Sequence, residues 1–235
     1  ALAVWRGESL RVSGNVHPWL VLTGALQYGL NYAGTYEAER YMASGLLAVL
    51  FSLMIFTNAI GGALFLGQPI SRRVVIGACL GVSGIALIFS PDITAATANP
   101  NLWLGIGLGL MAVLFASLGN ILTLRISRHG MALVPLLAWS MAYGALVVLL
   151  VAIASGAKFH IDPRLSYWLG MIYLSAFGSV AAFLLYFKLA QRQGSGRAAF
   201  IGMVVPVIAL VISGALEGWR PVPITGVGIA LCLGG

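Results

Sequence analysis

Charged residues are scarce in this sequence. Asp, Glu, Lys and Arg make up 8% of its 235 residues, whereas hydrophobic residues make up 60%. An ordinary soluble domain has about a quarter charged residues and roughly 45–50% apolar ones. A soluble fold could not remove so much apolar surface from water, because even a domain of about 300 residues leaves roughly a quarter of its surface exposed. The composition excludes an ordinary soluble domain and predicts an integral membrane protein.

Cysteine and histidine are rare as well. Cys79 and Cys232 both lie inside apolar runs, where they form neither a disulfide framework nor a metal cluster. His17, His129 and His160 lie in loops or at helix ends, so we expect solvated side chains without catalytic or metal-binding roles. We therefore predict that the protein has no metal and no cofactor.

The net charge is +7, from 13 Lys and Arg residues against 6 Asp and Glu residues. In a soluble protein such an excess would suggest nucleic-acid binding. Here no soluble basic domain is available for that role, and cytoplasmic loops of membrane proteins accumulate Arg and Lys. We therefore expect no nucleic-acid partner.

Long, continuous apolar runs account for most of the chain. A membrane helix needs about 20 apolar residues, whereas barrel strands are about 10 residues long and alternate in polarity. The sequence therefore predicts an all-α membrane protein, and the residues before the first complete span are typical of the end of an earlier one. The expected spans are approximately 18–37, 43–66, 74–90, 102–125, 132–154, 167–188, 198–217 and a short last one at 223–235.

Basic residues are distributed unevenly between alternate loops. One set of loops holds nine Arg and Lys residues and the other holds four. By the positive-inside rule the first set is cytoplasmic, which predicts a bacterial-type inner-membrane protein with both termini in the cytoplasm. The nine residues are Arg6, Arg11, Arg72, Arg73, Arg125, Arg128, Lys188, Arg192 and Arg197.

Two parts of the chain repeat each other. Glycines 67, 77 and 84 match glycines 218, 228 and 235 at a shift of 151. Trp19 and Gly29 match Trp168 and Gly178 at a shift of 149. The loop charges give the two halves opposite directions, which is the inverted-repeat architecture of alternating-access transporters.

The repeat also predicts the domain organisation. Residues 102–125 would be the first helix of the second half, and subtracting the shift of 151 places its equivalent in the first half before the start of this chain. We expect a ten-helix fold of five plus five, with about two helices absent from the start and the last helix truncated. Residues 1–101 would then belong to the first repeat and 102–235 to the second.

Three stretches resemble a known family. GALFLGQPISRRVVIGACLGVSGIALIF (62–89), LWLGIGLGLMAVLFASLGNILTLRIS (102–127) and the whole of 178–235 resemble EamA-type repeats of the drug/metabolite transporter superfamily. The resemblance implies ten helices in inverted repeats and transport of small metabolites, often outward. YddG-type exporters of amino acids are the natural comparison, although LFSLMIFTNA (50–59) lacks the tyrosine and proline pattern of their fourth helix. Gln68 stands where the family often has Glu.

Polar side chains within the spans are few, and such residues usually face a cavity because they are costly in lipid. Tyr28, Asn31, Tyr32 and Thr35 are spaced to share one helix face, and Gln27 precedes Asn31 by one turn. Aromatic rings could hold an ammonium group, and amides could bind a carboxylate or an amine. We predict a substrate pocket from these five residues together with Asn58, Trp139, Tyr143, Tyr173 and Ser179.

Two interpretations of the polar residues and of one proline remain open. The polar groups could instead hydrogen-bond between helices and only hold the bundle together. Pro206, in the middle of 198–217, removes a helix hydrogen bond and could act as a hinge or as a static kink.

No charged residue lies deep in any span. The absence of Lys and Arg argues against phosphorylated substrates, and the absence of Asp and Glu argues against a proton relay. We therefore predict an alternating-access carrier that exports small neutral or zwitterionic metabolites such as amino acids. Its expected partners are this substrate and the lipid bilayer, and a monomer is one possible state. The alternatives are a multidrug or lipophilic-compound exporter of the same superfamily and a non-transporting scaffold. An enzyme is disfavoured because no nucleophile–base pair is recognisable.

Overall fold

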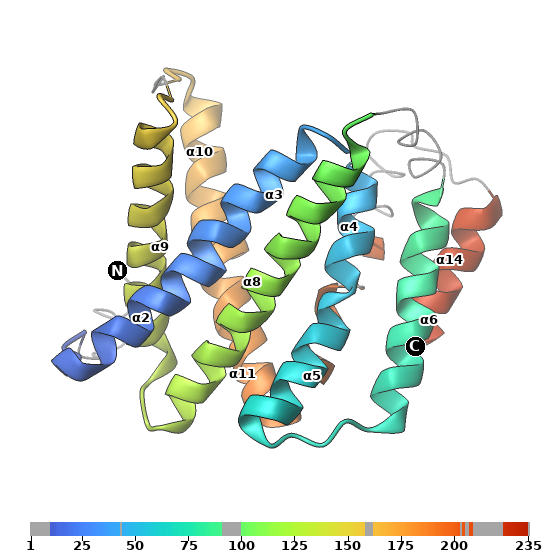
Figure 1. The fold of residues 1–235 in the computed structure, drawn as a ribbon, viewed down its shortest axis with the longest axis horizontal. Coiled ribbons are helices and arrows are strands. Elements are labelled where there is room, and N and C mark those ends of the chain that lie inside the picture. The colour runs from blue at the N-terminus through green and yellow to red at the C-terminus, as the bar shows by residue number, and fades with distance from the viewer. Residues whose placement is uncertain are drawn as a thin grey trace.

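The computed structural model describes residues 10–42, 44–90, 100–157, 162–202, 204, 207–208 and 223–234. Within these ranges the chain is helical and has no strand (Figure 1), which confirms the all-α prediction. In chain order the elements are η1 (Gly14–Val16), α2 (His17–Gly24), η2 (Ala25–Leu30), α3 (Asn31–Glu39), α4 (Ser44–Ser52), α5 (Met54–Leu66), α6 (Arg72–Ile88), α8 (Leu102–Arg128), α9 (Leu133–Ala154), α10 (Leu165–Tyr173), η3 (Leu174–Ala181), α11 (Ala182–Gln193), α12 (Ser195–Ala198) and α14 (Pro223–Gly234).

Several of these helices are long enough to cross a bilayer. Among the described residues, four segments combine sufficient length with sufficient hydropathy: Leu46–Leu66, Leu102–Arg128, Leu133–Ala154 and Leu165–Gln193. The α2–η2–α3 helix is also continuous, but it carries the polar residues noted in the sequence. Most of the predicted span 198–217, including Pro206, lies outside the described residues.

Helix α8 is the central element of the bundle, and α2, η2, α3, α4 and α5 all pack against it. Small residues permit this close packing. A Cβ atom added to Gly109 would come within 2.7 Å of a Leu50 methyl carbon, and one added to Gly105 within 2.9 Å of Tyr41. Membrane helices associate through such small residues because lipid provides no hydrophobic drive between them. The glycine pair therefore sets how near α8 lies to the first part of the chain.

Two of the long helices contain a π-helical segment. The segment η2 joins α2 to α3, and η3 joins α10 to α11, in each case without a break in the helix. Adding the repeat shift of 149 to 25–30 gives 174–179, which falls within η3. A π segment widens the helix locally and is found frequently at functional sites.

Helices α6 and α14 pack closely along their length and are adjacent ribbons in Figure 1. A Cβ on either Gly84 or Gly228 would lie 2.6 Å from the carbonyl oxygen of the other. The Cys232 thiol donates to the Gly81 carbonyl at 3.5 Å, while Ile88 lies against Gly228. Since residue numbers rise in one helix as they fall in the other, the two helices are antiparallel.

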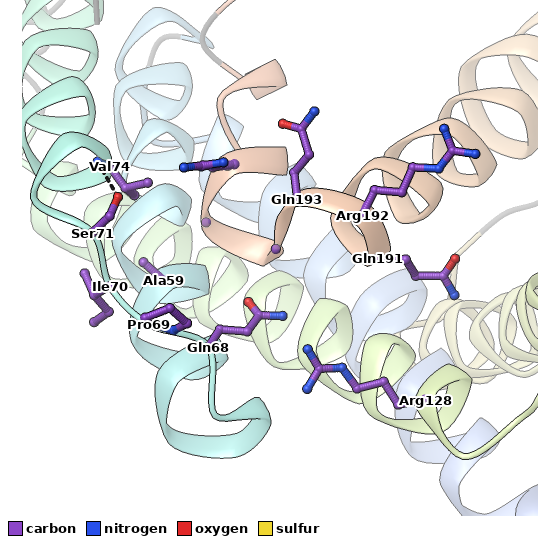
Figure 2. Close-up of a pocket in the computed structure, with 13 residues that line it drawn as sticks. Ala59, Gln68, Pro69, Ile70, Ser71, Val74, Arg128, Gln191, Arg192 and Gln193 are labelled. Carbon is purple, nitrogen blue, oxygen red and sulfur yellow. Dashed lines mark hydrogen bonds between the residues drawn. The ribbon is translucent and has the colours of Figure 1, made fainter.

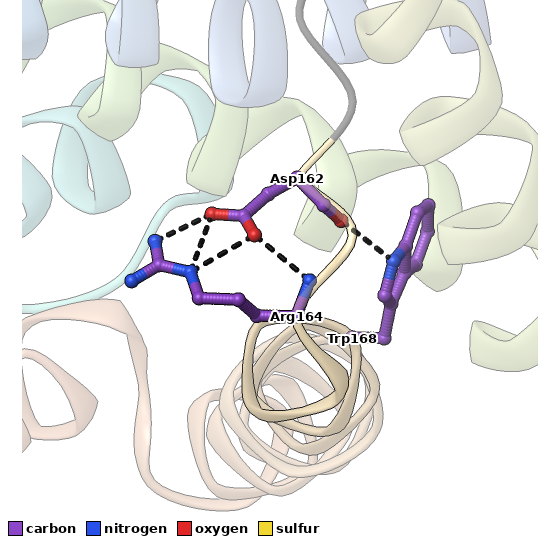
Figure 3. A network of polar contacts seen from close by, with 3 residues as sticks. All are labelled: Asp162, Arg164 and Trp168. Carbon is purple, nitrogen blue, oxygen red and sulfur yellow. Dashed lines mark hydrogen bonds and ion pairs between the residues drawn. The ribbon is translucent and has the colours of Figure 1, made fainter.

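Charge is separated between the two ends of the bundle. The described acids are Glu37 and Glu39, at the end of α3, and Asp162, before α10, and both places lie at the same end in Figure 1. Arg164 donates to the Asp162 carboxylate at 2.9 Å, and the Trp168 indole donates to the Asp162 carbonyl at 3.0 Å (Figure 3). The Arg164 guanidinium holds the pKa of the Asp162 carboxyl below its usual value. The opposite end holds Arg72, Arg73, Arg125, Arg128, Lys188, Arg192 and Arg197.

Candidate substrate site

Three buried amide side chains lie on helices that pack together, because η2 and α5 both contact α8. Gln27, on η2, lies so close to this helix that a Cβ on Gly119 would be 2.4 Å from the Gln27 Oε1 atom. The next residue, Asn120, points its Nδ2 atom at the Met54 sulfur of α5, 3.7 Å away. Asn58 follows Met54 by one turn of α5. We call Gln27, Asn58 and Asn120 the amide cluster, and each is no more than 3% exposed.

The amide cluster has unused hydrogen-bonding capacity. Within the described part of the chain, Gln27 Oε1, Asn58 Oδ1 and Asn120 Oδ1 are buried and have no hydrogen-bond partner. The Tyr28 hydroxyl and Thr123 Oγ1 share this condition. A buried polar atom without a partner costs about 1–3 kcal/mol, and most buried polar atoms have one. The cluster is therefore suited to bind N–H or O–H groups, and a rotated amide can donate as well as accept.

Asn58 also connects the cluster to helix α11. Its Nδ2 atom donates to the Tyr186 hydroxyl at 3.0 Å, across 128 residues of sequence. We did not predict Tyr186 as a site residue, because it is a lone tyrosine near the end of a predicted span and has no polar neighbour at helical spacing. Its role becomes visible only through its hydrogen bond with Asn58 on α5.

The polar helix face predicted from sequence lies on η2 and α3, and part of it faces the interior of the bundle. Tyr28 is buried, with its ring edge-on to Phe183 at 5.0 Å. Asn31 is buried as well and donates to the Gln27 carbonyl at 3.1 Å, and Thr35 donates to the Asn31 carbonyl at 2.8 Å. Tyr32 is 37% exposed. The structure thus brings Gln27, Tyr28 and Asn31 together in the interior.

Trp139 and Tyr143 form a separate aromatic group with a histidine. Their rings are stacked at 5.7 Å, the Tyr143 hydroxyl is 2.8 Å from His17 Nδ1, and the Trp139 indole donates to the Leu10 carbonyl at 2.9 Å. His17 therefore has a protein partner, in contrast to the solvated side chain expected from sequence. The cause is the close crossing of α2 and α9, where a Cβ on Gly24 would lie 2.3 Å from the Ser140 carbonyl oxygen.

The remaining predicted residues lie apart from the amide cluster or outside the described residues. Tyr173 is 62% exposed and contacts the Phe177 ring at 5.3 Å. Ser179 is half-buried on η3. Pro206 lies outside the described residues, so its role as a hinge stays a prediction.

A polar junction that sequence reasoning missed joins α5 to α12. The Ser195 backbone N–H donates to Gln68 Oε1 at 3.0 Å, and the Ser195 Oγ atom lies 2.9 Å from the same oxygen and 2.8 Å from the Asn58 carbonyl. A Cβ on Gly62 would be 2.4 Å from Ser195 Oγ, so glycine is needed for this approach. We call Ser195, Gln68 and Asn58 the Ser195 junction. Its sequence signal is only the GSG triplet at 194–196.

A pocket of about 370 Å³ opens beside the Ser195 junction at the cationic end of the bundle (Figure 2). Gln68, Ser71, Arg128, Arg192 and Arg197 provide much of its polar lining. A second pocket, of about 230 Å³, shares Gln68 and Arg128 and extends along α8 to Ser127 and Leu124. None of the residues predicted from sequence lines either pocket. In the described ranges no group of three or more His, Cys, Asp or Glu side chains could hold a metal ion.

Comparison with known proteins identifies the class of protein. The EamA-like transporter family matches residues 1–90 and 103–235. The chain therefore belongs to the EamA-like transporter family of the drug/metabolite transporter superfamily, and it is a multi-pass membrane protein. The resemblance seen in the sequence is confirmed.

Curated relatives are distant in sequence but cover most of the chain. Protein PecM of Dickeya dadantii is 25% identical over 82% of this chain and 63% of its own length. An uncharacterized transporter of Synechocystis is 27% identical, covering 97% of this chain and 70% of the relative. A probable amino-acid metabolite efflux pump of Salmonella typhimurium is 24% identical, covering 86% and 71%. The chain thus spans 63% to 70% of the first two of these relatives.

A solved crystal structure has the same fold. It superimposes with a TM-score of 0.79 at 18% sequence identity, covering 99% of this chain and 78% of the other. At this identity the likeness supports the fold alone.

Proposed function

We propose that this protein is an alternating-access exporter of small neutral or zwitterionic metabolites such as amino acids. Family membership supplies the coarse function, which is transport. The finer proposal rests on one observation, the buried and unpartnered oxygens of the amide cluster. The helices that hold it, η2, α5 and α8, contain no charged residue except Arg125 and Arg128 in the last turn of α8. Such a site suits cargo that needs hydrogen bonds but no counter-charge.

The helix pair α6·α14 supports an inverted repeat. Gly81 and Cys232 touch each other and are 151 residues apart, which is the repeat shift. Under the repeat, Gly81 corresponds to Cys232 and Cys232 to Gly81, so exchanging the two halves leaves this contact unchanged. A two-fold axis that passes through the contact would have this effect. The antiparallel pairing and the π segments at matching positions fit the same relation.

The Ser195 junction supports a mechanism in which one end of the pathway closes. If the cationic end is cytoplasmic, as the positive-inside rule proposes, the junction is a cytoplasmic gate between α5 and α12. Asn58 belongs to both places, since its carbonyl accepts from Ser195 while its side chain lies in the amide cluster. A cargo molecule that binds the Asn58 side chain and moves it would therefore also move the Asn58 carbonyl, which accepts the hydrogen bond from Ser195.

The direction of transport and the class of cargo are proposed from the name of one relative. One relative carries the name of a probable amino-acid metabolite efflux pump, which favours export of amino-acid metabolites here as well. The alternative, export of lipophilic drugs, predicts competition by lipophilic cations rather than by amino acids.

The test is efflux from proteoliposomes with Gln27→Leu and Asn120→Leu. We expect each variant to lose about tenfold or more in transport, equivalent to at least about 1.4 kcal/mol, with thermal stability retained or raised. Stability should be retained, because each leucine removes a buried oxygen that has no partner, and Asn120→Leu loses in exchange only the long Nδ2 contact with the Met54 sulfur. Ser83→Leu, on the exposed surface of α6, is the control and should transport normally.

Two outcomes would contradict the proposal. Normal efflux by both leucine variants would remove the amide cluster from the pathway. Inhibition of the wild-type protein by tetraphenylphosphonium but by none of the free amino acids would favour the multidrug alternative.

A further inference from the structure

The pocket at the cationic end has a strongly one-sided charge. Arg128, Arg192 and Arg197 line it, and no acidic residue does. Among the described residues the ion pairs are Arg40 with Glu37 and Arg164 with Asp162, both at the opposite end of the bundle. The three guanidinium groups of the pocket therefore lack a carboxylate partner in the described part of the chain.

One of these arginines is held in place by the backbone. Arg128 donates to the Leu66 carbonyl at 2.6 Å, which fixes the guanidinium while leaving other N–H donors for a ligand. Figure 2 shows its side chain directed toward Gln68. Helix α6 begins at Arg72, next to the lining residue Ser71, so the positive end of its dipole adds to the field. Arginines arranged in this way favour a phosphate group, which they can bind through two N–H groups at once.

Helices α5 and α6, which each contribute a residue to the pocket lining, carry exposed apolar side chains. Ile70 lines the pocket and is 46% exposed, and Ile76, one turn into α6, is 60% exposed. Leu64, near the end of α5, is 73% exposed. In a membrane protein such a surface contacts acyl chains. A ligand with an anionic head and an apolar tail would match both the pocket and this surface.

We propose that the pocket lined by Arg128, Arg192 and Arg197 binds the phosphate headgroup of an anionic phospholipid, whose acyl chains lie along α5 and α6. This site is separate from the amide cluster, and its occupation does not depend on the identity of the transported cargo. Anionic lipids are attracted to basic groups at the cytoplasmic leaflet, which agrees with the orientation proposed above.

The test is thermal unfolding of the purified protein in a neutral detergent. Phosphatidylglycerol should raise Tm by about 3 °C or more, because a ligand that binds only the folded form stabilises it. Phosphatidylcholine with the same acyl chains, and inorganic phosphate, should each give a much smaller rise. An equal rise with phosphatidylcholine would overturn the proposal, and an equal rise with inorganic phosphate would assign the pocket to a free anion.

Matched variants separate the pocket from general surface charge. Arg192→Gln combined with Arg197→Gln should abolish the phosphatidylglycerol shift. Arg73→Gln combined with Arg125→Gln removes the same charge from the same end outside this pocket and should keep the shift. The proposal would be overturned if both double variants lost the phosphatidylglycerol-induced rise in Tm, or if both kept it. If the first double variant does not fold, native mass spectrometry of the single variants replaces it, and Arg192→Gln should retain less phosphatidylglycerol than Arg125→Gln.

Discussion

At the residue scale, Asn58 connects more of the proposed mechanism than its sequence position suggests. Its amide donates to Tyr186 on α11, its carbonyl accepts from Ser195 at the start of α12, and its Oδ1 atom has no partner among the described residues. These contacts join sequence positions 128 and 137 residues apart. A change at Asn58 would disturb cargo binding and the gate together, so its partners give cleaner tests.

Tyr186→Phe removes the hydroxyl that accepts from Asn58 and leaves the ring in place. We expect an unfolding free energy lower by about 1 kcal/mol and efflux reduced about fivefold or more, because the Asn58 amide loses its fixed orientation. Tyr36→Phe is the matched control, since that side chain is 70% exposed and lies outside the predicted site, and it should change neither quantity. Unchanged efflux in Tyr186→Phe would show that orientation of the amide is unimportant.

At the element scale, helix contacts depend on where glycine faces a neighbouring backbone. Gly84 on α6 lies against Gly228 on α14, with no room for a Cβ atom on either residue. Gly107 on α8 has no atom within 4 Å of the position its Cβ would take. The two glycines look alike in sequence, and only their neighbours distinguish them.

Gly84→Ala and Gly107→Ala should therefore have opposite effects on stability. The first places a methyl group 2.6 Å from the Gly228 carbonyl oxygen and should lower Tm by several degrees. The second should leave Tm unchanged or raise it, since alanine favours a helix by up to about 1 kcal/mol over glycine. Thermal unfolding in detergent measures both, and a normal Tm for Gly84→Ala would contradict the close α6·α14 contact.

The sequence predicted the elements better than their contacts. Continuous apolar runs placed the long helices correctly, because length and hydropathy are local properties. The sequence did not predict the π segments or the boundary between α4 and α5 at Leu53, because the hydropathy pattern there is almost uniformly apolar. Gln27 and Asn31 were identified by spacing along one helix, whereas Ser195 acts through residues more than a hundred positions away. Trp139 and Tyr143 have the expected spacing, but their partner His17 could not be inferred from it.

At the scale of the whole molecule, charge defines two different ends. The described acids lie at the end where α3 finishes and α10 begins, and a group of arginines lies at the other. The positive-inside rule makes the arginine end cytoplasmic. This orientation is a proposal that labelling can test.

Glu39→Cys and Arg73→Cys, each placed in a Cys79→Ser and Cys232→Ser background, should differ in accessibility. In intact cells a membrane-impermeant maleimide should label the cysteine at position 39, because that end faces outward. The cysteine at position 73 should react only after the membrane is permeabilised. The reverse pattern would invert the orientation, and with it the assignment of the Ser195 junction as a cytoplasmic gate.

The lack of charge in the helices around the amide cluster has an electrical consequence. A potential of 100 mV does about 2.3 kcal/mol of work on each elementary charge that crosses the bilayer. Gln27, Asn58 and Asn120 carry no charge, so reorienting them without cargo would move none across the membrane. At this site voltage would then act only through the net charge of the cargo itself, so a bound zwitterion would feel no net force from the membrane potential.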